Sequence, residues 1–225
     1  MPTQLFSADP EDDDQEFEED FAEETRPQSH LPQELRRRQL IATAAHVFSS
    51  KGYQTTSMEH IAQASHITKP ELYQYFTGKR DLYMAVLDEQ VDGLLTQLVQ
   101  PLYNTTDNRE RVRGMISAFF SFARNNASGY HIIFDSDLHA DPAVLERLET
   151  VHQMIAHHIA DVLAPNAGIS HREALLTARM LTGMVLSATR AIVGDPNNDE
   201  ALAESERTVF RLAWGGISQL HEDWE

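Results

Sequence analysis

The chain has 225 residues, of which 41% are hydrophobic and 24% charged, and its formal net charge is −17. This length is enough to bury a hydrophobic core in one large domain or two modest ones. The sequence has no cysteine, which excludes disulfides, thiolate metal sites and a cysteine nucleophile. Its apolar runs are too short to span a membrane and its N-terminus is acidic, so we expect a cytoplasmic protein with no membrane partner.

The charge is unevenly distributed along the chain. Residues 1–30 hold 11 acidic side chains and one basic side chain, whereas residues 31–80 hold seven basic and three acidic ones. The rest of the chain is acidic again. A basic segment confined to one short stretch of an acidic protein indicates a local nucleic-acid-binding surface.

Residues 1–30 are polar, strongly charged and without periodicity. Because such a segment cannot bury enough apolar surface to offset the loss of chain entropy, we expect a disordered acidic tail. Its phenylalanines could dock on a partner, and its acids could mimic nucleic-acid phosphates. A solubilising role is the favoured interpretation.

From Leu31 onward the hydrophobic periodicity is helical, and no hairpin signal separates alternating apolar runs. The first helix should begin near Pro32 and end at Gly52. A later helix, Lys79 to about Tyr103, is long enough at about 1.5 Å per residue to join two parts of the molecule. The predicted fold is all-α, with further helices at about 57–64, 68–75, 107–126, 128–138, 141–164, 170–193 and 199–221.

The segment from Ser57 to Phe76 predicts a helix-turn-helix. Ser57 and Thr68 are suitable N-cap residues for two short helices, and Pro70 fits the first turn of the second. The turn between them is Ser65-His66-Ile67. The second helix of such a motif enters the major groove of DNA.

About fifty residues from Arg36 to Leu87 resemble the DNA-binding head of the TetR family of transcriptional regulators. One departure is His66, where the family usually has glycine; histidine there needs a positive φ, which it tolerates. The resemblance implies a DNA-binding domain over residues 31–78 and a ligand-binding and dimerisation domain over residues 79–225. Its motifs are Ala44-Ala45, Phe48, Gly52-Tyr53, Thr56-Ser57, Ile61-Ala62, Thr68-Lys69, Leu72-Tyr73, Tyr75-Phe76, Lys79 and Leu82.

The resemblance also implies contacts with an operator in double-stranded DNA. Hydroxyl, lysine and helix N-terminal groups suit phosphates, whereas Gln74 suits an adenine edge. The alternative, that a tyrosine only covers the core, applies to at most one of Tyr73 and Tyr75, which diverge on a helix. The predicted DNA-binding residues are Arg37, Arg38, Thr56, Ser57, Thr68, Lys69, Glu71, Tyr73, Gln74, Tyr75 and Lys79.

A narrower resemblance, to actinobacterial regulators of fatty-acid synthesis, rests on Thr105 to Arg109, Gly129-Tyr130, Ile133-Phe134 and Ala213 to Gly216. It implies long-chain acyl-CoA as the effector. Periodicity alone favours an ordinary packed core over a ligand pocket. The predicted pocket residues are Val91, Leu94, Leu98, Leu102, Met115, Ile116, Phe119, Phe120 and Ala123.

The last two helices are predicted to form a homodimer. Gly215-Gly216 within a helix costs about 1 kcal/mol per glycine relative to alanine, which suggests close approach of another helix. By resemblance these helices pair with their symmetry mates, and a twofold dimer suits a palindromic operator. The predicted interface residues are Leu181, Met184, Val185, Ala188, Phe210, Ala213, Trp214 and Ile217.

Catalysis is not expected, because neither a nucleophile motif nor a nucleotide-binding fingerprint occurs and the histidine spacings do not suit a metal. No cofactor or metal is predicted. The sequence therefore predicts a homodimeric repressor of fatty-acid synthesis genes, released from DNA by long-chain acyl-CoA. Two alternatives stay open: a repressor of an efflux or catabolic operon that senses another hydrophobic molecule, and a protein-interaction module without DNA binding.

Overall fold

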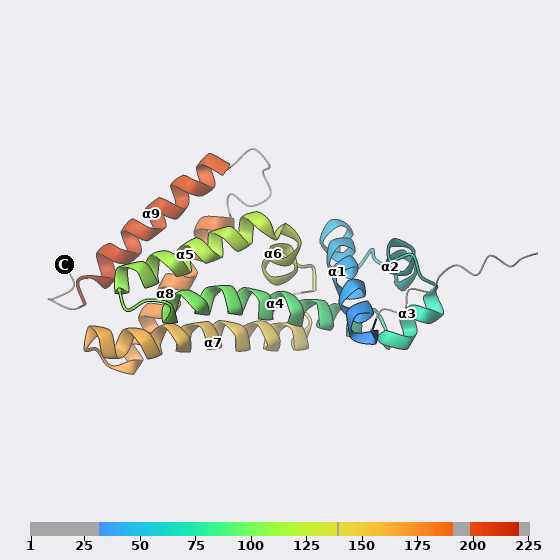
Figure 1. The fold of residues 1–225 in the computed structure, drawn as a ribbon, viewed down its shortest axis with the longest axis horizontal. Helices are drawn as coiled ribbons and strands as arrows, with labels where there is room; N and C mark the ends of the chain where they lie inside the picture. The colour runs from blue at the N-terminus through green and yellow to red at the C-terminus, as the bar shows by residue number, and fades with distance from the viewer. Residues whose placement is uncertain (1–31, 139, 191–198, 221–225) are drawn as a thin grey trace, which may run out of the picture.

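The computed structural model describes residues 32–138, 140–190 and 199–220, and every regular element within them is an α-helix (Figure 1). The predicted all-α fold is confirmed. The predicted acidic tail lies outside the described residues. The helices are α1 (Gln33–Lys51), α2 (Met58–Ala64), α3 (Lys69–Tyr75), α4 (Lys79–Tyr103), α5 (Asn108–Asn125), α6 (Ala127–Phe134), α7 (Pro142–Ala167), α8 (His171–Arg190) and α9 (Asp199–Ile217).

The molecule is elongated, with α1 to α3 forming a small head at one end (Figure 1). The long helix α4 runs from this head into a larger bundle, where it packs against α5, α6 and α7. Helix α8 packs on α7, and α9 packs on α5 and α8. Helix α4 also packs on α1, so a single rigid element contacts both ends of the molecule.

Helix α4 forms as predicted because an apolar stripe recurs along its 25 residues. Pro101 lies in its last turn, where the helix is about to end. Gly114 of α5 lies opposite, and a Cβ atom there would be 2.7 Å from the Cβ of Pro101. The missing side chain therefore permits close packing of α4 and α5. The buried residues of α4 are Leu82, Tyr83, Val86, Leu87, Val91, Leu94, Leu98 and Leu102.

Several predicted helix ends differ from the structure, and α9 ends at Ile217 rather than residue 221. Helix α6 ends at Phe134 rather than residue 138, and its cap Asp135 donates its N–H to the carbonyl of His131. Helix α7 continues through Pro165 to Ala167 and stops at Gly168, whose φ of 64° is left-handed. The short loop after α6 therefore lies beside the head rather than within a helix.

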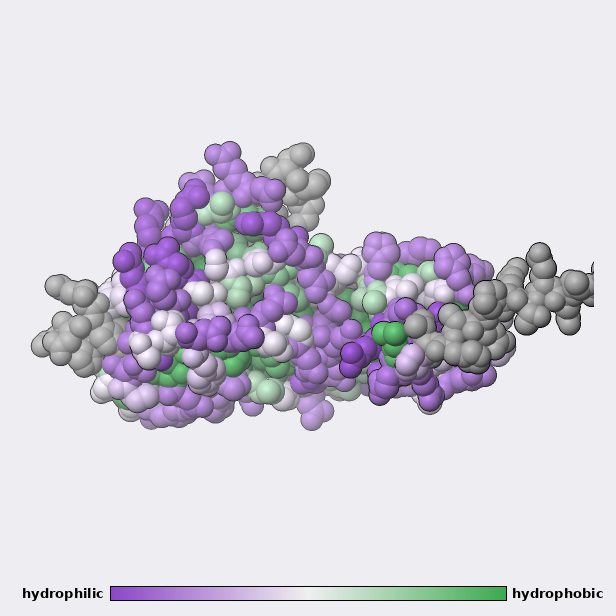
Figure 2. Space-filling model, in the orientation of Figure 1, coloured by the Kyte–Doolittle hydropathy of each residue, from purple (hydrophilic) through white to green (hydrophobic). Residues whose placement is uncertain are grey.

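One main apolar core extends from α1 through the bundle to α9. In Figure 2, apolar side chains show between hydrophilic ones over the bundle. A smaller cluster of Ala160, Leu163, Ala167, Ala174 and Ile217 lies at the end of the bundle away from the head. No helix in the described ranges is long and apolar enough to cross a membrane.

Candidate nucleic-acid interface and ligand cavity

Helices α2 and α3 form the predicted helix-turn-helix, and side-chain bonds fix the start of each. The Ser57 hydroxyl accepts from the His60 N–H at 3.2 Å, and the His60 ring accepts from the Ser57 N–H at 3.3 Å. At the start of α3, the Thr68 hydroxyl accepts from the Glu71 N–H at 3.3 Å. His66 has a φ of 55°, which confirms the predicted positive φ in the turn. The motif therefore closes without the usual glycine.

One buried side chain holds α3 against the head, while several others face solvent. Leu72 is fully buried, whereas Lys69, Tyr73 and Gln74 are exposed, Tyr73 by 46%. Side chains of these types donate to phosphate oxygens and base edges. Contact with DNA stays a prediction for these three and for the other exposed members of the predicted set, Arg37, Arg38, Ser57 and Thr68.

Two predicted phosphate contacts are corrected by the structure. The Thr56 side chain is buried, and its hydroxyl donates to the Gly52 carbonyl at 2.7 Å. The Lys79 ammonium donates to the carbonyls of Tyr53 and Thr56, both at 2.9 Å, and lies 4.2 Å from the centre of the Tyr53 ring. Both side chains therefore donate to backbone carbonyls of the turn between α1 and α2 and stabilise it.

Three other predicted DNA-binding residues make interactions within the head itself. Glu71 pairs with Arg36 across a 3.7 Å Nη2 to Oε1 distance, and the Arg37 guanidinium lies 5.1 Å from the Phe76 ring centre. Tyr75 is half-buried and packs against the core. The exposed basic and polar groups of the head thus belong mainly to the first turns of α1 and to one face of α3.

A cavity lies among α4, α5, α6, α7, α8 and α9, and together with the solvent space at its open mouth it encloses about 960 Å³. Five predicted pocket residues line it: Leu98, Leu102, Met115, Ile116 and Phe119. The other four are buried but do not line it: Val91, Leu94, Phe120 and Ala123. They lie nearer the head, where α6 packs against both α4 and α5.

Sequence reasoning missed the far wall and the polar groups of the cavity. Ile155, Ile159 and Leu163 of α7 face it from the side opposite α5. The helical periodicity of α7 indicates a buried face but does not show which part of that face lines a cavity. The polar lining residues are Asn108, Arg111, His152 and Thr182.

Half of the predicted dimer interface lies inside the single chain. Leu181, Val185, Ala213 and Ile217 line the cavity, and the last three are buried within the single chain, so those three are not available to a second copy. This corrects the prediction, because the apolar periodicity of α8 and α9 reflects packing within the chain. The remaining four, Met184, Ala188, Phe210 and Trp214, are half-buried.

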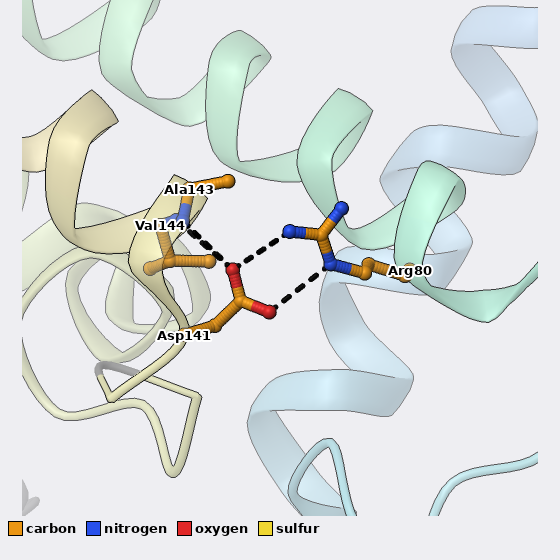
Figure 3. Close-up of polar contacts among 4 residues, drawn as sticks. All are labelled: Arg80, Asp141, Ala143 and Val144. Carbon is orange, nitrogen blue, oxygen red and sulfur yellow. Dashed lines mark hydrogen bonds and ion pairs between the residues drawn. The ribbon is translucent and has the colours of Figure 1, made fainter.

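The start of α4, next to the head, is joined to α7 by an ion pair between Arg80 and Asp141, the N-cap of α7 (Figure 3). The Arg80 Nε and Nη2 donate to the two carboxylate oxygens at 3.0 and 2.9 Å. The same carboxylate accepts from the N–H groups of Ala143 and Val144. The bond from Arg80 lowers the pKa of Asp141 from its ordinary 3.8 to about 2.

The loop after α6 makes a second link. The Asp137 carboxylate accepts from the N–H groups of Tyr53 and Gln54, each at 3.0 Å, and thereby caps the turn after α1. Tyr83 of α4 donates to the Ser136 hydroxyl at 2.5 Å, and burial raises the pKa of Tyr83 to about 12. The α1 to α2 turn, the start of α4 and the loop after α6 therefore form one hydrogen-bonded junction.

Comparison with known proteins matches this architecture. A family model described as bacterial regulatory proteins of the tetR family matches residues 40–86. The "HTH-type transcriptional activator FasR" of Mycolicibacterium smegmatis is 34% identical over 195 residues, which cover 85% of this chain and 87% of that protein.

Two solved structures share the fold. A TetR-like transcriptional regulator from Rhodococcus sp. RHA1 aligns with a TM-score of 0.69 at 22% identity, covering 84% of this chain and 98% of that one. The transcriptional regulator FadR from Bacillus subtilis, solved in complex with stearoyl-CoA, aligns with a TM-score of 0.68 at 17% identity, covering 80% of this chain and 98% of that one.

Proposed function

The chain belongs to the TetR family of bacterial regulatory proteins, and its DNA-binding domain is non-enzymatic. From this premise we propose that it is a homodimeric regulator of lipid biosynthesis genes, controlled by a long-chain acyl-CoA held in the α4 to α9 cavity. The proposal assigns residues 31–78 to DNA binding and residues 79–225 to ligand binding and dimerisation.

The observation that carries the proposal is that one helix contacts both the cavity and the head. Leu98 and Leu102 of α4 line the cavity, while Leu82 and Tyr83 near its start are fully buried in the core beside α1. Because packed helices move as units, a ligand that displaces the far end of α4 also moves the head. A hundredfold change in DNA affinity needs about 2.7 kcal/mol of coupling.

The lining of the cavity supports an acyl chain as the ligand. Most lining residues are leucine, isoleucine, valine, methionine or phenylalanine, which favour a flexible apolar molecule. A regulator of the same fold has been solved with stearoyl-CoA. The segments Thr105 to Arg109 and Ala213 to Gly216, on which the narrower resemblance rests, both lie beside this cavity or contribute to it.

The sign of regulation follows from the position of the operator rather than from the fold. The 34% identical relative is described as an activator, whereas the sequence of this chain predicts a repressor. Repression stays a prediction. Control of DNA binding by the ligand operates in the same way in both cases.

The exposed faces of α8 and α9 support a homodimer. Leu176 and Met180 on α8 and Leu212 on α9 are exposed by 60%, 60% and 63%. A Cβ atom added to Gly183 or Gly215 would meet nothing within 4 Å. These apolar and small residues leave room for the helices of a second copy to approach closely, and a twofold dimer places two α3 helices on successive major grooves.

Fluorescence anisotropy with a labelled palindromic duplex from the promoter region of the protein's own gene cluster tests the proposal. We expect the log of affinity to fall with the log of salt concentration with a slope of roughly −5, because Arg37, Arg38 and Lys69 are doubled in a dimer. We also expect stearoyl-CoA, and not coenzyme A alone, to release the duplex.

The two alternatives give different results in the same assay. A regulator of an efflux or catabolic operon would bind DNA with the same salt dependence but would not respond to stearoyl-CoA. A protein-interaction module would show no salt-dependent binding of any duplex. Either result would contradict the proposed function.

A further inference from the structure

The cavity contains one permanently charged side chain, Arg111 of α5. It is half-buried, and the described chain places no carboxylate within ion-pair distance of it. A charge removed from water without an opposite charge is costly, so proteins pair such groups or use them to bind ions. An unpaired guanidinium in an apolar cavity therefore needs an explanation.

Neutral oxygen atoms hold the guanidinium in one orientation. Its Nε donates to the Thr105 carbonyl at 2.9 Å, and its Nη1 donates to the side-chain oxygens of Asn108 at 2.8 Å and Asn166 at 3.4 Å. These bonds use three of the five N–H groups of arginine. The two N–H groups of Nη2 have no partner in the described part of the chain.

The nearby carboxylates are engaged elsewhere. Asp107 caps α5 by accepting from the N–H groups of Arg109 and Glu110, and the Glu110 carboxylate pairs with Arg113 at 3.5 Å. Neither carboxylate therefore neutralises the positive charge of Arg111, although the chain carries a net charge of −17. A positioned guanidinium with two spare donors is suited to a carboxylate or phosphate.

Apart from Asn108, His152 and Thr182, the rest of the cavity lining is apolar. Phe119 lies two helical turns after Arg111, about 12 Å along α5 at 1.5 Å per residue. Its ring is 5.7 Å from the ring of Phe134 on α6, which also lines the cavity. The cavity therefore has a cationic end and an aromatic end, which is complementary to a molecule with an acidic head and an apolar tail.

We propose that Arg111 binds the anionic head group of the effector and so orients its apolar tail toward Phe119 and Phe134. The anion is the carboxylate of a fatty acid or a phosphate of its coenzyme A thioester. This proposal rests on the proposed function, because it assumes that the cavity is the effector site. It adds the residue that selects an acidic amphiphile over a neutral one.

The test compares dodecanoic acid, 1-dodecanol and dodecanoyl-CoA by isothermal titration calorimetry at pH 8 and low salt. The acid and the alcohol share the same tail, so their affinity ratio cancels any general change in apolar packing. Wild-type protein, Arg111→Gln and Arg111→Lys are compared with the control Arg109→Gln. Arg109 is exposed on the same helix, and its removal changes the net charge equally without touching the cavity lining.

If the carboxylate is the anion, we expect the wild-type protein to bind the acid at least tenfold more tightly than the alcohol. Arg111→Gln should bring this ratio close to one, while Arg111→Lys and Arg109→Gln should keep the preference. If a phosphate is the anion, Arg111→Gln should instead weaken dodecanoyl-CoA at least tenfold, with acid and alcohol bound equally by the wild-type protein.

The proposal is overturned if Arg111→Gln keeps both the acid preference and the dodecanoyl-CoA affinity of the wild-type protein. Should that variant fail to fold, equal binding of all three ligands by the wild-type protein would also overturn it, while leaving the proposed function intact. If the wild-type protein binds none of the three and does not bind stearoyl-CoA, the proposed function itself fails.

Discussion

Arg80 and Asp141 are 61 positions apart in the chain, yet they form a two-point ion pair between the first turns of α4 and α7 (Figure 3). Arg80 is in the helix that enters the head, and Asp141 caps a helix that forms a wall of the cavity. The pair therefore fixes α4 to α7 near the junction with the head.

This pair predicts a defined pH dependence of stability. The folded-state pKa of Asp141 is about 2, below its ordinary 3.8, so ionised Asp141 favours the folded state. Its contribution should be complete above about pH 5 and should disappear as pH falls toward 2. Urea unfolding of the wild type and Asp141→Asn at a series of pH values tests this, since asparagine retains the capping oxygen. A difference between the two proteins that grows with acid would contradict the assignment.

We predict that Lys79 contributes to the stability of the folded head rather than to DNA contact. Lys79→Met keeps much of the stem but removes the ammonium that bonds the carbonyls of Tyr53 and Thr56. Because hydrogen bonds to a charged group are worth about 1.5 to 3 kcal/mol each, we expect unfolding at a lower urea concentration, with a loss of about 2 kcal/mol or more. Lys51→Met, at the exposed end of α1, controls for the loss of a positive charge. Unchanged stability with lost DNA affinity would restore the phosphate role.

We predict that Gln74 contacts a base edge of the operator and that Tyr73 contacts a phosphate. Both are exposed on α3. Gln74→Ala should reduce discrimination at one or two base pairs by about 1 to 3 kcal/mol, because glutamine pairs with a base edge. Tyr73→Phe should weaken all sequences alike, because a phosphate contact carries no sequence information. Affinities for a panel of operator variants separate the two effects. Equal, sequence-independent losses would show that the roles are assigned wrongly.

The structure favours Leu212 over Trp214 as the residue at which to test the dimer interface. Trp214 is half-buried, whereas Leu212 is 63% exposed on the open face of α9. Leu212→Asp should yield monomers in analytical ultracentrifugation and lose operator binding, because an unpaired charge in a packed interface is costly. Leu145→Asp is the matched control, since Leu145 is 59% exposed on α7. Dimers in the first variant, or monomers in the second, would place the interface elsewhere.

Local signals in the sequence were sufficient for the helices and for most exposed groups of α3. Caps such as Ser57 and Asp141, and the breaker Gly52, act within a few residues and so can be read from the sequence. Long-range contacts cannot be read in this way. The Lys79 ammonium reaches carbonyls 23 and 26 positions away, which removed it from the expected phosphate contacts.

The same limit explains the cavity and the dimer face. Periodicity shows that Val185 and Ile217 are buried, but it does not distinguish burial within the chain from burial against a second copy. The sequence did not indicate that Arg111 lines the cavity, because an arginine in an amphipathic helix is ordinarily a solvated residue. Only the three-dimensional arrangement shows that it faces a cavity and lacks a carboxylate partner.

Phe119→Ala should separate ligand binding from the response to it. Phe119 lines the cavity and packs against Phe134 of α6 with the two rings tilted and their centres 5.7 Å apart. Helix α6 in turn contacts α1 through a 2.9 Å bond between Ser128 and Ser49. The truncation should cost about 3 kcal/mol of stability, yet stearoyl-CoA should still bind because the space only widens. DNA release should weaken, since the chain no longer displaces the ring. Phe122→Ala controls for stability, because Phe122 is buried away from the cavity. If both variants release DNA as the wild type does, the signal does not pass through Phe119.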